Sequence, residues 1–348
     1  MGNPLASDLD HILAHTEGLW EELRDRQLFI TGGTGFFGCW ILESFVWAND
    51  RLGLNAQALV LTRDMEAFRK KAPHLATHRA ISFHIGDVRT FEFPMGAFSY
   101  MIDAGTPASA KLNQEDPVLM LEMIIEGTRH TLEFARRSGV KKYLFVSSGA
   151  VYGRQPSEMT HIPEEYGGAP GTMEIGSAYA EGKRLAELWC TIFHQQYGIE
   201  TKIARCFAFV GPYLPLDIHF AIGNFIRDAL TQKPVRMEGD GTPFRSYLYA
   251  ADLAIWLWTI LFRGKPCRAY NVGSSDEISI LDLANMVAIS VHPPYKVEVA
   301  KKPVAGRLPD RYVPSTKRAF IELGLEQKIP LAEAIRKTLS WYSAHKEQ

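Results

Sequence analysis

The chain has 348 residues, 46% of them hydrophobic, and a formal net charge of −1 at pH 7. This length accommodates one large α/β domain and a smaller lobe. The near-zero charge gives no global field that would draw the protein to nucleic acid or to an anionic membrane, so we expect neither partner. Anionic ligands must therefore be held by local groups.

The cysteines are scattered without metal-type spacing, and the histidines form no ligand constellation, so we expect no metal site. They are Cys39, Cys190, Cys206 and Cys267, which resemble small core hydrophobes and suit a reducing cytoplasm. The polar residues 1–10 predict no signal peptide. The most apolar run, Leu253–Phe262, is too short to span a bilayer and predicts a buried helix.

Apolar residues at helical spacing predict a helix over Asp8–Arg26, within an N-terminal unit of residues 1–26. In residues 27–211, helices and strands then alternate, which predicts a parallel, doubly wound (Rossmann) sheet. The expected strands are Leu28–Thr31, Ala58–Leu61, Ile81–His84, Tyr100–Asp103, Tyr143–Ser147 and Thr201–Phe207, and the expected helices are Phe36–Asp50, Asp116–Ser138 and Ser177–Tyr197.

The pattern changes after the strand Thr201–Phe207. Residues 212–348 mix short strands, helices and many prolines, and the expected strands there are Val235–Met237, Arg268–Val272 and Val297–Val299. We interpret this part mainly as a smaller, mixed α/β substrate-binding lobe over the carboxyl edge of the sheet, with a soft boundary to the sheet domain. Ligands of such folds bind at that edge.

A glycine-rich turn, Gly32-Gly33-Thr34-Gly35-Phe36-Phe37-Gly38, follows the first strand and precedes a helix. The first glycine permits a sharp turn, the second lets the backbone approach a pyrophosphate, and the third allows close helix–strand packing. The helix N-terminus presents free N–H groups to the phosphates. The plain alternative is a turn that needs small residues. The pattern predicts a dinucleotide site made by Gly32, Gly35, Phe36, Phe37 and Gly38.

Two further strand ends belong to this expected site. The second strand ends in Thr62-Arg63-Asp64, where an acid favours NAD and an arginine favours NADP. Thr62 stands where the acid is expected and Arg63 follows it, so this strand end leaves NAD and NADP open. Asp87 and Val88, after the third strand, are expected against the adenine, although an ordinary strand-end turn explains them equally well.

Tyr179 and Lys183 are four residues apart on one expected helix, so they share a face. The phenol, with an ordinary pKa of about 10, becomes a base near neutral pH if the Lys183 ammonium and an oxidised nicotinamide lie beside it. Lys183 would also hold the nicotinamide ribose. Ser148, at a strand end, would hold the substrate oxygen against Tyr179. The three residues predict proton removal from a hydroxyl-bearing carbon as its hydride moves to the cofactor.

Each motif has a plainer explanation. A tyrosine four residues from a lysine occurs often by chance, and a serine pair at a strand end can cap a turn. A cofactor-sensing module would keep the fold without the chemistry. Such modules typically lose the tyrosine or the lysine, whereas this chain has both Tyr179 and Lys183.

With these motifs the chain resembles the extended short-chain dehydrogenase/reductase family, specifically its nucleotide-sugar epimerases, dehydratases and decarboxylases, over about Gln27 to Tyr342. The resemblance implies that Ser148 and Tyr179 handle the proton and that Lys183 assists. It also implies a bound NAD. Asp103 departs from the family, whose corresponding strand end usually leads with His, and the sequence gives no account of this aspartate.

The residues after Ser148 separate the reactions of this family. The 4,6-dehydratases carry an Asp-Glu pair where this chain has Gly149 and Ala150, and UDP-glucuronate decarboxylases carry Glu at the second position. The motif Ser-Ser-x-Ala-Val-Tyr-Gly resembles that of the 4-epimerases, whereas the segments Thr106–Ser109 and Tyr179–Arg184 resemble those of the decarboxylases. A 4-epimerase is therefore the first expectation. A decarboxylase and an NADPH-dependent 4-keto-sugar reductase are the alternatives.

The resemblance further implies a nucleoside-diphosphate sugar as the ligand and pairing into a homodimer through the helices Asp116–Ser138 and Ser177–Tyr197. Two guanidinium groups and an amide can neutralise a diphosphate in a chain of little net charge. Each arginine could equally form a surface ion pair. The implied substrate-binding residues are Thr106, Ser148, Asn224, Arg245, Arg307 and Asp310.

Overall fold

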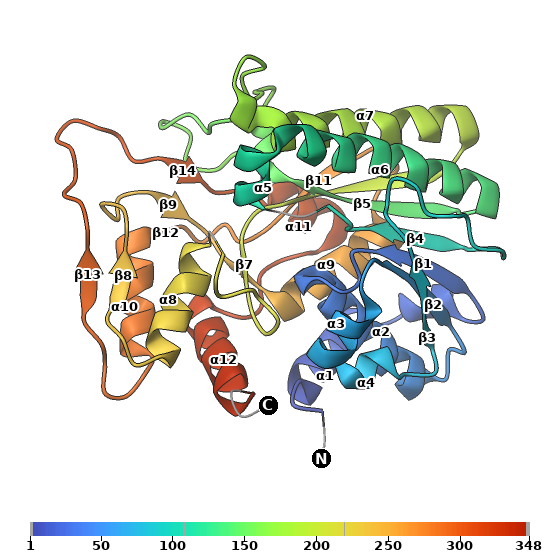
Figure 1. The fold of residues 1–348 in the computed structure, drawn as a ribbon, viewed down its shortest axis with the longest axis horizontal. Helices are drawn as coiled ribbons and strands as arrows, with labels where there is room; N and C mark the ends of the chain where they lie inside the picture. The colour runs from blue at the N-terminus through green and yellow to red at the C-terminus, as the bar shows by residue number, and fades with distance from the viewer. Residues whose placement is uncertain (1–2, 107–108, 219, 346–348) are drawn as a thin grey trace.

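The computed structural model describes residues 3–106, 109–218 and 220–345. Within them, seven strands form a parallel central sheet in the order β11-β6-β5-β4-β1-β2-β3 (Figure 1). They are β1 Gln27–Thr31, β2 Gln57–Thr62, β3 Ile81–Ile85, β4 Tyr100–Asp103, β5 Lys142–Ser148, β6 Glu200–Cys206 and β11 Ala269–Val272. The strand order reverses between β1 and β4, and this confirms the expected doubly wound α/β fold.

The sheet is buried on both faces, which is why its strands are continuous apolar runs. Leu28, Phe29 and Ile30 of β1 are all fully buried. Every expected strand of this sheet is present, and its ends move by at most one residue.

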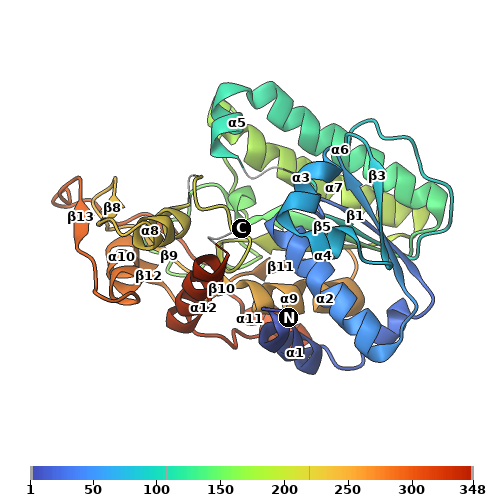
Figure 2. The same cartoon turned by 60° about the horizontal axis from the view of Figure 1, so that its bottom comes forward.

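Helices cover both faces of the sheet. Figure 2 shows α5 (Ala110–Glu115), α6 (Pro117–Ser138) and α7 (Ala178–Tyr197) on one side, and α1 (Ala6–His15), α2 (Phe36–Leu52) and α9 (Ala250–Arg263) on the other. The helices α3 (Met65–Lys71) and α4 (Pro73–Ala76) follow β2. Local signals set these boundaries. Asp116 accepts a hydrogen bond from Leu119 N at the start of α6, and Gly139 ends it with φ +80°.

The expected N-terminal helix Asp8–Arg26 is wrong in its extent. The helix α1 ends at His15, and a separate 3₁₀ turn, η1, spans Trp20–Leu23. The hydroxyl of Thr16 donates to the backbone oxygen of Ile12 at 2.6 Å, and Gly18 takes φ +75°. A left-handed glycine after a bonded last turn stops the helix. The apolar residues continue beyond the break because both pieces pack on the same core.

The C-terminal lobe lies beyond one edge of the sheet domain (Figure 1). It holds three small sheets and the helices α8 (Ala221–Leu230), α10 (Ile280–Ile289) and α12 (Leu331–Ala344). The small sheets pair β7 (Phe209–Val210) with β10 (Leu248–Tyr249), β8 (Val235–Met237) with β13 (Val297–Val299), and β9 (Phe244–Arg245) with both β12 (Ile278–Ser279) and β14 (Arg311–Tyr312). The remaining elements are the 3₁₀ turns η2 (Gly149–Tyr152) and η3 (Ile175–Ser177), and the helix α11 (Lys317–Leu323).

Residues 250–272 return from this lobe to the central sheet. They form α9, which is buried from Ala250 to Phe262, and the edge strand β11. The expected buried helix over Leu253–Phe262 is confirmed, and Trp256 and Trp258 are core residues.

Candidate active site

The glycine turn lies between β1 and α2, where the strand order reverses. Gly32 has φ +67°, and a Cβ there would lie 2.1 Å from the backbone oxygen of Ala104, after β4. A Cβ on Gly38 would lie 2.3 Å from Gly32 O. Gly35 is the N-cap residue of α2, and in the described chain no side chain caps that helix by a hydrogen bond. The free N–H groups of its first turn could hold a pyrophosphate, and this contact stays a prediction.

The two phenylalanines of the turn are half-buried at the start of α2. The ring of Phe37 packs edge-on against Phe209 of β7, with the ring centroids 5.0 Å apart. Phe36 packs on Phe37 at 5.7 Å. The pair thus links the glycine turn to the first strand of the outer lobe, and its expected contact with a cofactor stays a prediction.

The end of β2 presents mixed charges. Thr62 is buried, and its hydroxyl accepts a hydrogen bond from Asp64 N at 3.2 Å. The carboxylate of Asp64 caps α3 by accepting from Ala67 N at 2.9 Å. Arg63 is exposed, and Lys71 Nζ donates to Thr34 O of the glycine turn at 3.0 Å. This arrangement leaves both NAD and NADP open.

Asp87 follows β3 and forms an ion pair with Arg89, with Nε 2.9 Å from Oδ1. This arginine holds the pKa of Asp87 below its ordinary value. Val88 packs against Gly127 of α6, where a Cβ would lie 2.9 Å from Val88 Cγ1. The carboxylate is therefore charged and half-exposed beside the sheet edge.

Ser148 and Ser147 point to different sides at the end of β5. The Ser147 hydroxyl donates to Glu187 Oε1 at 2.6 Å, and Glu187 in turn pairs with Arg205 at 2.7 Å. Ser148 lies close enough to the phenol of Tyr179 to lower its pKa, and the Ser148 hydroxyl accepts a hydrogen bond from Ala150 N at 3.1 Å. The structure brings Ser148 and Tyr179 together as the sequence predicted.

Tyr179 is the second residue of α7, and a side chain outside the helix holds its backbone. Its backbone N–H donates to Asn113 Oδ1 at 2.9 Å, and Asn113 Nδ2 donates to Gly176 O at 2.7 Å. Burial raises the pKa of Tyr179 to about 12, and the nearby Ser148 hydroxyl only partly opposes this. The expected base near neutral pH is therefore not produced by the chain alone, because desolvation disfavours the phenolate.

Lys183 lies one turn further along α7 and is 3% exposed. Its ammonium donates to Val146 O at 2.7 Å and to Thr106 Oγ1 at 3.1 Å, and it lies 4.6 Å above the ring of Phe145. Burial lowers the pKa of Lys183 to about 8, and the negative charge of Asp103 is the largest opposing influence. Thr106 thus contacts the lysine in this structure, and its expected contact with substrate stays a prediction. Residues 107 and 108, in the decarboxylase-like segment Thr106–Ser109, lie outside the described residues.

A second phenol, which the sequence did not point to, lies beside Ser148. Ser148 lies close enough to Tyr312 of β14 to lower the pKa of its phenol, but burial outweighs this and raises that pKa above its ordinary value. Its ring packs on Phe207 with centroids 4.6 Å apart. A Cβ on Gly149 would lie 2.7 Å from both Tyr312 Oη and Phe207 Cζ. No residue with a side chain fits at position 149 unless these rings move.

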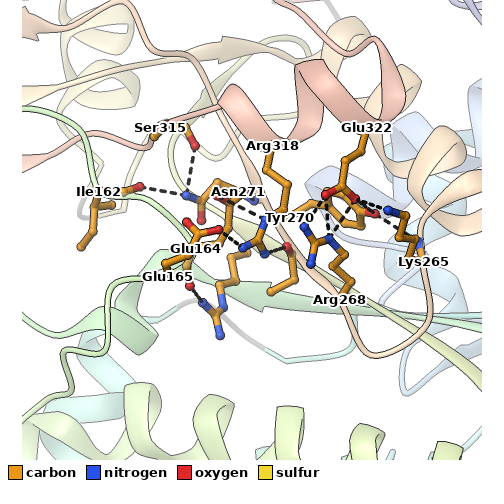
Figure 3. A network of polar contacts seen from close by, with 12 residues as sticks. Ile162, Glu164, Glu165, Lys265, Arg268, Tyr270, Asn271, Ser315, Arg318 and Glu322 are labelled. Carbon is orange, nitrogen blue, oxygen red and sulfur yellow. Dashed lines mark hydrogen bonds and ion pairs between the residues drawn. The ribbon is translucent and has the colours of Figure 1, made fainter.

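A polar network around Asn271 of β11 fixes the segment that carries Tyr312 (Figure 3). Asn271 is fully buried, and its Nδ2 donates to Ile162 O at 2.9 Å and to Ser315 O at 3.1 Å. Arg318 forms ion pairs with Glu164 and Glu165. The network joins the chain after η2 to the chain after β14, so Tyr312 is held against β5 by residues distant in sequence.

The profile of the NAD dependent epimerase/dehydratase family matches residues 28–273. The chain belongs to this family. It is a family of enzymes, NAD-dependent nucleotide-sugar epimerases, dehydratases and decarboxylases, and the matched range contains the glycine turn, Ser148, Tyr179 and Lys183.

Curated relatives of this epimerase/dehydratase family member include UDP-glucuronic acid decarboxylase 1 of Arabidopsis thaliana. It is 28% identical over 314 residues, which are 90% of this chain and 69% of the relative. Among solved structures, the UDP-glucose 4-epimerase of Thermus thermophilus in complex with NAD is 26% identical, with a TM-score of 0.72 and coverage of 90% and 98%. The dTDP-glucose 4,6-dehydratase DesIV of Streptomyces venezuelae, with NAD bound, shares the fold at 21% identity and a TM-score of 0.78, with coverage of 92% and 98%.

The residues that the family resemblance assigned to the diphosphate are spread over the outer lobe. Asn224 of α8 accepts from Arg227 Nη1 at 3.0 Å. Arg245 of β9 is half-buried, and its guanidinium carbon lies 6.0 Å from the ring centroid of Tyr312. The exposed Arg307 lies 3.4 Å from Asp310. Arg245 thus lies close to Tyr312, whereas Arg307 forms an ion pair at the surface.

Asp310 forms a second ion pair, since Arg154 Nη2 lies 2.6 Å from its Oδ1. Arg154 follows η2, so this pair joins the loop after Ser148 to the outer lobe. Asp310 already forms ion pairs with Arg154 and Arg307, so its expected hydrogen bond with a nucleotide ribose would have to form alongside these ion pairs. That contact stays a prediction.

Two observations bear on other ligand classes. Across residues 3–106, 109–218 and 220–345, no three His, Cys, Asp or Glu side chains gather into a group able to hold a metal ion. None of the helices in the described chain is both long enough and apolar enough to cross a bilayer.

Sequence reasoning missed Tyr312 and Asn113. Tyr312 follows the motif Arg307-Leu-Pro-Asp310 by two residues, which is the one local signal that could have pointed to it. Asn113 acts only through the start of α7, and no pattern in its own segment marks it.

Proposed function

We propose that this chain is a 4-epimerase of a nucleoside-diphosphate sugar that works by transient oxidation at the sugar C4. The observation that carries the proposal is the pairing of Ser148 with Tyr179 while Gly149 is closed off by Tyr312 and Phe207. A proton-handling hydroxyl pair is present, and the position that bears an acid in the 4,6-dehydratases has no room for one.

NAD, bound along the glycine turn, would supply a reversible hydride acceptor. Ser148 orients the 4-hydroxyl oxygen of the sugar, and Tyr179 Oη takes its proton as the C4–H bond breaks. The resulting 4-keto sugar turns over between the sheet edge and the outer lobe, and hydride returns to its other face. Tyr179 then gives the proton back to the oxygen, so the cofactor is not consumed.

To act as a base near neutral pH, Tyr179 requires a positive charge beside its phenol, which an oxidised nicotinamide would supply. The chain alone keeps this phenol neutral, with a pKa of about 12. A cation beside the ring favours the phenolate, and each unit by which the pKa falls requires about 1.4 kcal/mol of differential interaction. Tyr179 is thus a base only when the cofactor is in place and oxidised, which couples proton removal to hydride transfer.

Incubation of the protein and NAD⁺ with UDP-, dTDP-, CDP- and GDP-hexoses, followed by proton NMR, tests the proposal. A C4 epimer should accumulate to an equilibrium mixture from at least one of them, with no net change in NADH absorbance. No conversion of any of these sugars contradicts it.

Decarboxylation of a nucleotide-linked uronic acid is the second candidate, and the identity to plant UDP-glucuronic acid decarboxylases favours it. Once C4 is oxidised, loss of CO₂ from the β-keto acid needs little further help, so a chain with Ala150 in place of the family's Glu can still perform it. Release of labelled CO₂ from UDP-glucuronate would select this reaction. Steady consumption of NADPH would instead select the 4-keto-sugar reductase.

We also propose that the protein acts as a homodimer in the cytoplasm. The helices α6 and α7 lie side by side and expose Val118, Leu185, Leu188 and Tyr197. The thiols of Cys39, Cys190 and Cys206 are buried and unpaired, which suits a reducing compartment. Light scattering that gives a monomer mass would contradict the dimer.

A further inference from the structure

Asp103 is a buried carboxylate at the end of β4, and the described residues that donate hydrogen bonds to it are all neutral. Thr31 Oγ1 donates to Oδ1 and Tyr143 Oη donates to Oδ2, both at 2.6 Å, and the hydroxyl of Thr131 lies 3.2 Å from Oδ2. Gly105 N donates to Oδ1 at 3.5 Å. The side chain is 4% exposed, and none of the ion pairs formed by the described residues involves it.

The surroundings of Asp103 connect it to Lys183. Asp103 is paired with Phe145 across β4 and β5, and the Lys183 ammonium lies above that phenylalanine ring. Two residues beyond Asp103, Gly105 belongs to the turn that places Thr106 Oγ1 3.1 Å from Lys183 Nζ. Through Thr31, the same carboxylate is tied to the strand that leads into the glycine turn.

We propose that Asp103 is a positioning residue of this site, whose buried carboxylate shapes the turn against Lys183 and supplies the negative charge that keeps this lysine protonated. It acts through Lys183 and does not itself touch the reacting atoms. The proposal depends on the proposed function only for the catalytic use of Lys183.

The other charged groups near Lys183 do not fill this role. Glu187, on the same helix, is already neutralised by the guanidinium of Arg205, which binds both of its carboxylate oxygens. Burial raises the pKa of the Cys190 and Cys206 thiols, so both are neutral. Asp103 is therefore the acid near Lys183 whose charge is not balanced by an arginine or a lysine among the described ion pairs.

The test measures the protonation of Lys183 in the protein without any ligand. Lysine labelled with ¹³C at Cε is followed by NMR from pH 6 to 11, and the Lys183 signal is assigned by its absence in Lys183→Met. In the wild type we expect a midpoint at about 8. In Asp103→Asn the midpoint should fall by about one unit or more, since a nearby opposite charge typically shifts a pKa by about 1–3 units.

Thr131→Val is the matched control. It removes a hydroxyl from Asp103 Oδ2 but keeps the charge, so the midpoint should stay within about 0.3 units, well below the shift expected for a lost charge. If Asp103→Asn does not fold, Asp103→His provides the second variant, because the family usually carries His at this strand end, and its midpoint should fall in the same way.

A Lys183 midpoint that stays at the wild-type value in a folded Asp103→Asn or Asp103→His protein would overturn the proposal. An equal fall in Thr131→Val would also overturn it, since packing and not charge would then be responsible. Neither result depends on a substrate, so failure of the epimerase proposal remains a separate outcome.

Discussion

The ammonium of Lys183 donates a hydrogen bond of 2.7 Å to the backbone oxygen of Val146, two residues before Ser148. The lysine that the sequence placed beside Tyr179 is therefore also fastened to the strand that carries the serine. The two hydrogen bonds that Lys183 forms with described residues go to the edge of the sheet, and its ammonium is buried. Burial of this ammonium should change the free energy of unfolding measurably.

Lys183→Met should abolish turnover without destabilising the protein at pH 7. Burial lowers the folded-state pKa of Lys183 from 10.5 to about 8, which corresponds to a cost of about 3 kcal/mol at neutral pH. Methionine removes that cost but leaves Val146 O unpaired, at about 1–3 kcal/mol. Urea denaturation should give an unchanged or higher free energy of unfolding, and a fall of more than about 2 kcal/mol would contradict this.

The direction in which folding stability changes with pH provides a second measurement of the ionisation of Lys183. Between about pH 8 and 10.5 the unfolded chain binds the Lys183 proton and the folded protein does not. The contribution of this group to stability therefore rises with pH across that window and is constant below it. The rise should be missing in Lys183→Met.

Tyr179→Phe should lower turnover by about 10²–10⁴-fold, the range of general acid–base catalysis, while the affinity for nucleotides stays within about threefold. In the free wild type, the Tyr179 phenol should ionise at about pH 12. Oxidised cofactor should shift this to lower pH, because positive charge favours the phenolate. The absorbance difference at the tyrosinate band between wild type and Tyr179→Phe measures both values, and identical midpoints with and without NAD⁺ would be evidence against the mechanism.

Gly149→Ala should destabilise the protein by about 1–3 kcal/mol through overpacking. The new Cβ would lie 2.7 Å from Tyr312 Oη and Phe207 Cζ. Gly167→Ala is the matched control, because a Cβ there meets no atom within 4 Å. Thermal unfolding of the two variants compares them directly, and equal melting temperatures would show that position 149 has room for a side chain.

Asn271→Leu should lower the free energy of unfolding more than any single substitution at the surface end of the polar network around Asn271. It leaves Ser315 O without its partner and removes one of the two hydrogen bonds made by Ile162 O and by the Tyr152 hydroxyl, at about 1–3 kcal/mol for a buried group left unsatisfied. Glu165→Gln is the control, since it removes only an exposed ion pair with Arg318, worth at most about 1 kcal/mol. Chemical denaturation that ranks Glu165→Gln as the more damaging change would contradict this account.

Arg63→Ala should reduce affinity for NADP⁺ by about tenfold or more and leave affinity for NAD⁺ unchanged, since a guanidinium at this strand end pairs with a 2′-phosphate. Asp64 is already engaged in capping α3. Isothermal titration with each dinucleotide gives the two affinities. Equal losses for both would place Arg63 on a shared part of the cofactor.

The parts of the fold that sequence could predict are those set by local pattern. The apolar run of β1, the glycines after it and the four-residue spacing of Tyr179 and Lys183 each carry their own signal, and each is found in place. The predicted N-terminal helix extends too far because its apolar spacing continues across the break at Gly18. A hydrogen bond from Thr16 and the left-handed backbone of Gly18 set this break.

Contacts between distant segments could not be predicted in this way. Tyr312 reaches Ser148 only because the network around Asn271 fastens two loops to each other. The same holds for Asp103, whose departure from the family is explained by hydroxyl donors from β1, β5 and α6 that no local pattern reveals.

A nucleotide sugar deuterated at C4 tests the central claim most directly. If Tyr179 takes the hydroxyl proton while the C4 hydrogen passes to the nicotinamide and returns, the inverted product keeps its deuterium at C4 and the cofactor shows no net reduction. An inverted product that has exchanged its C4 deuterium for solvent hydrogen would contradict the account.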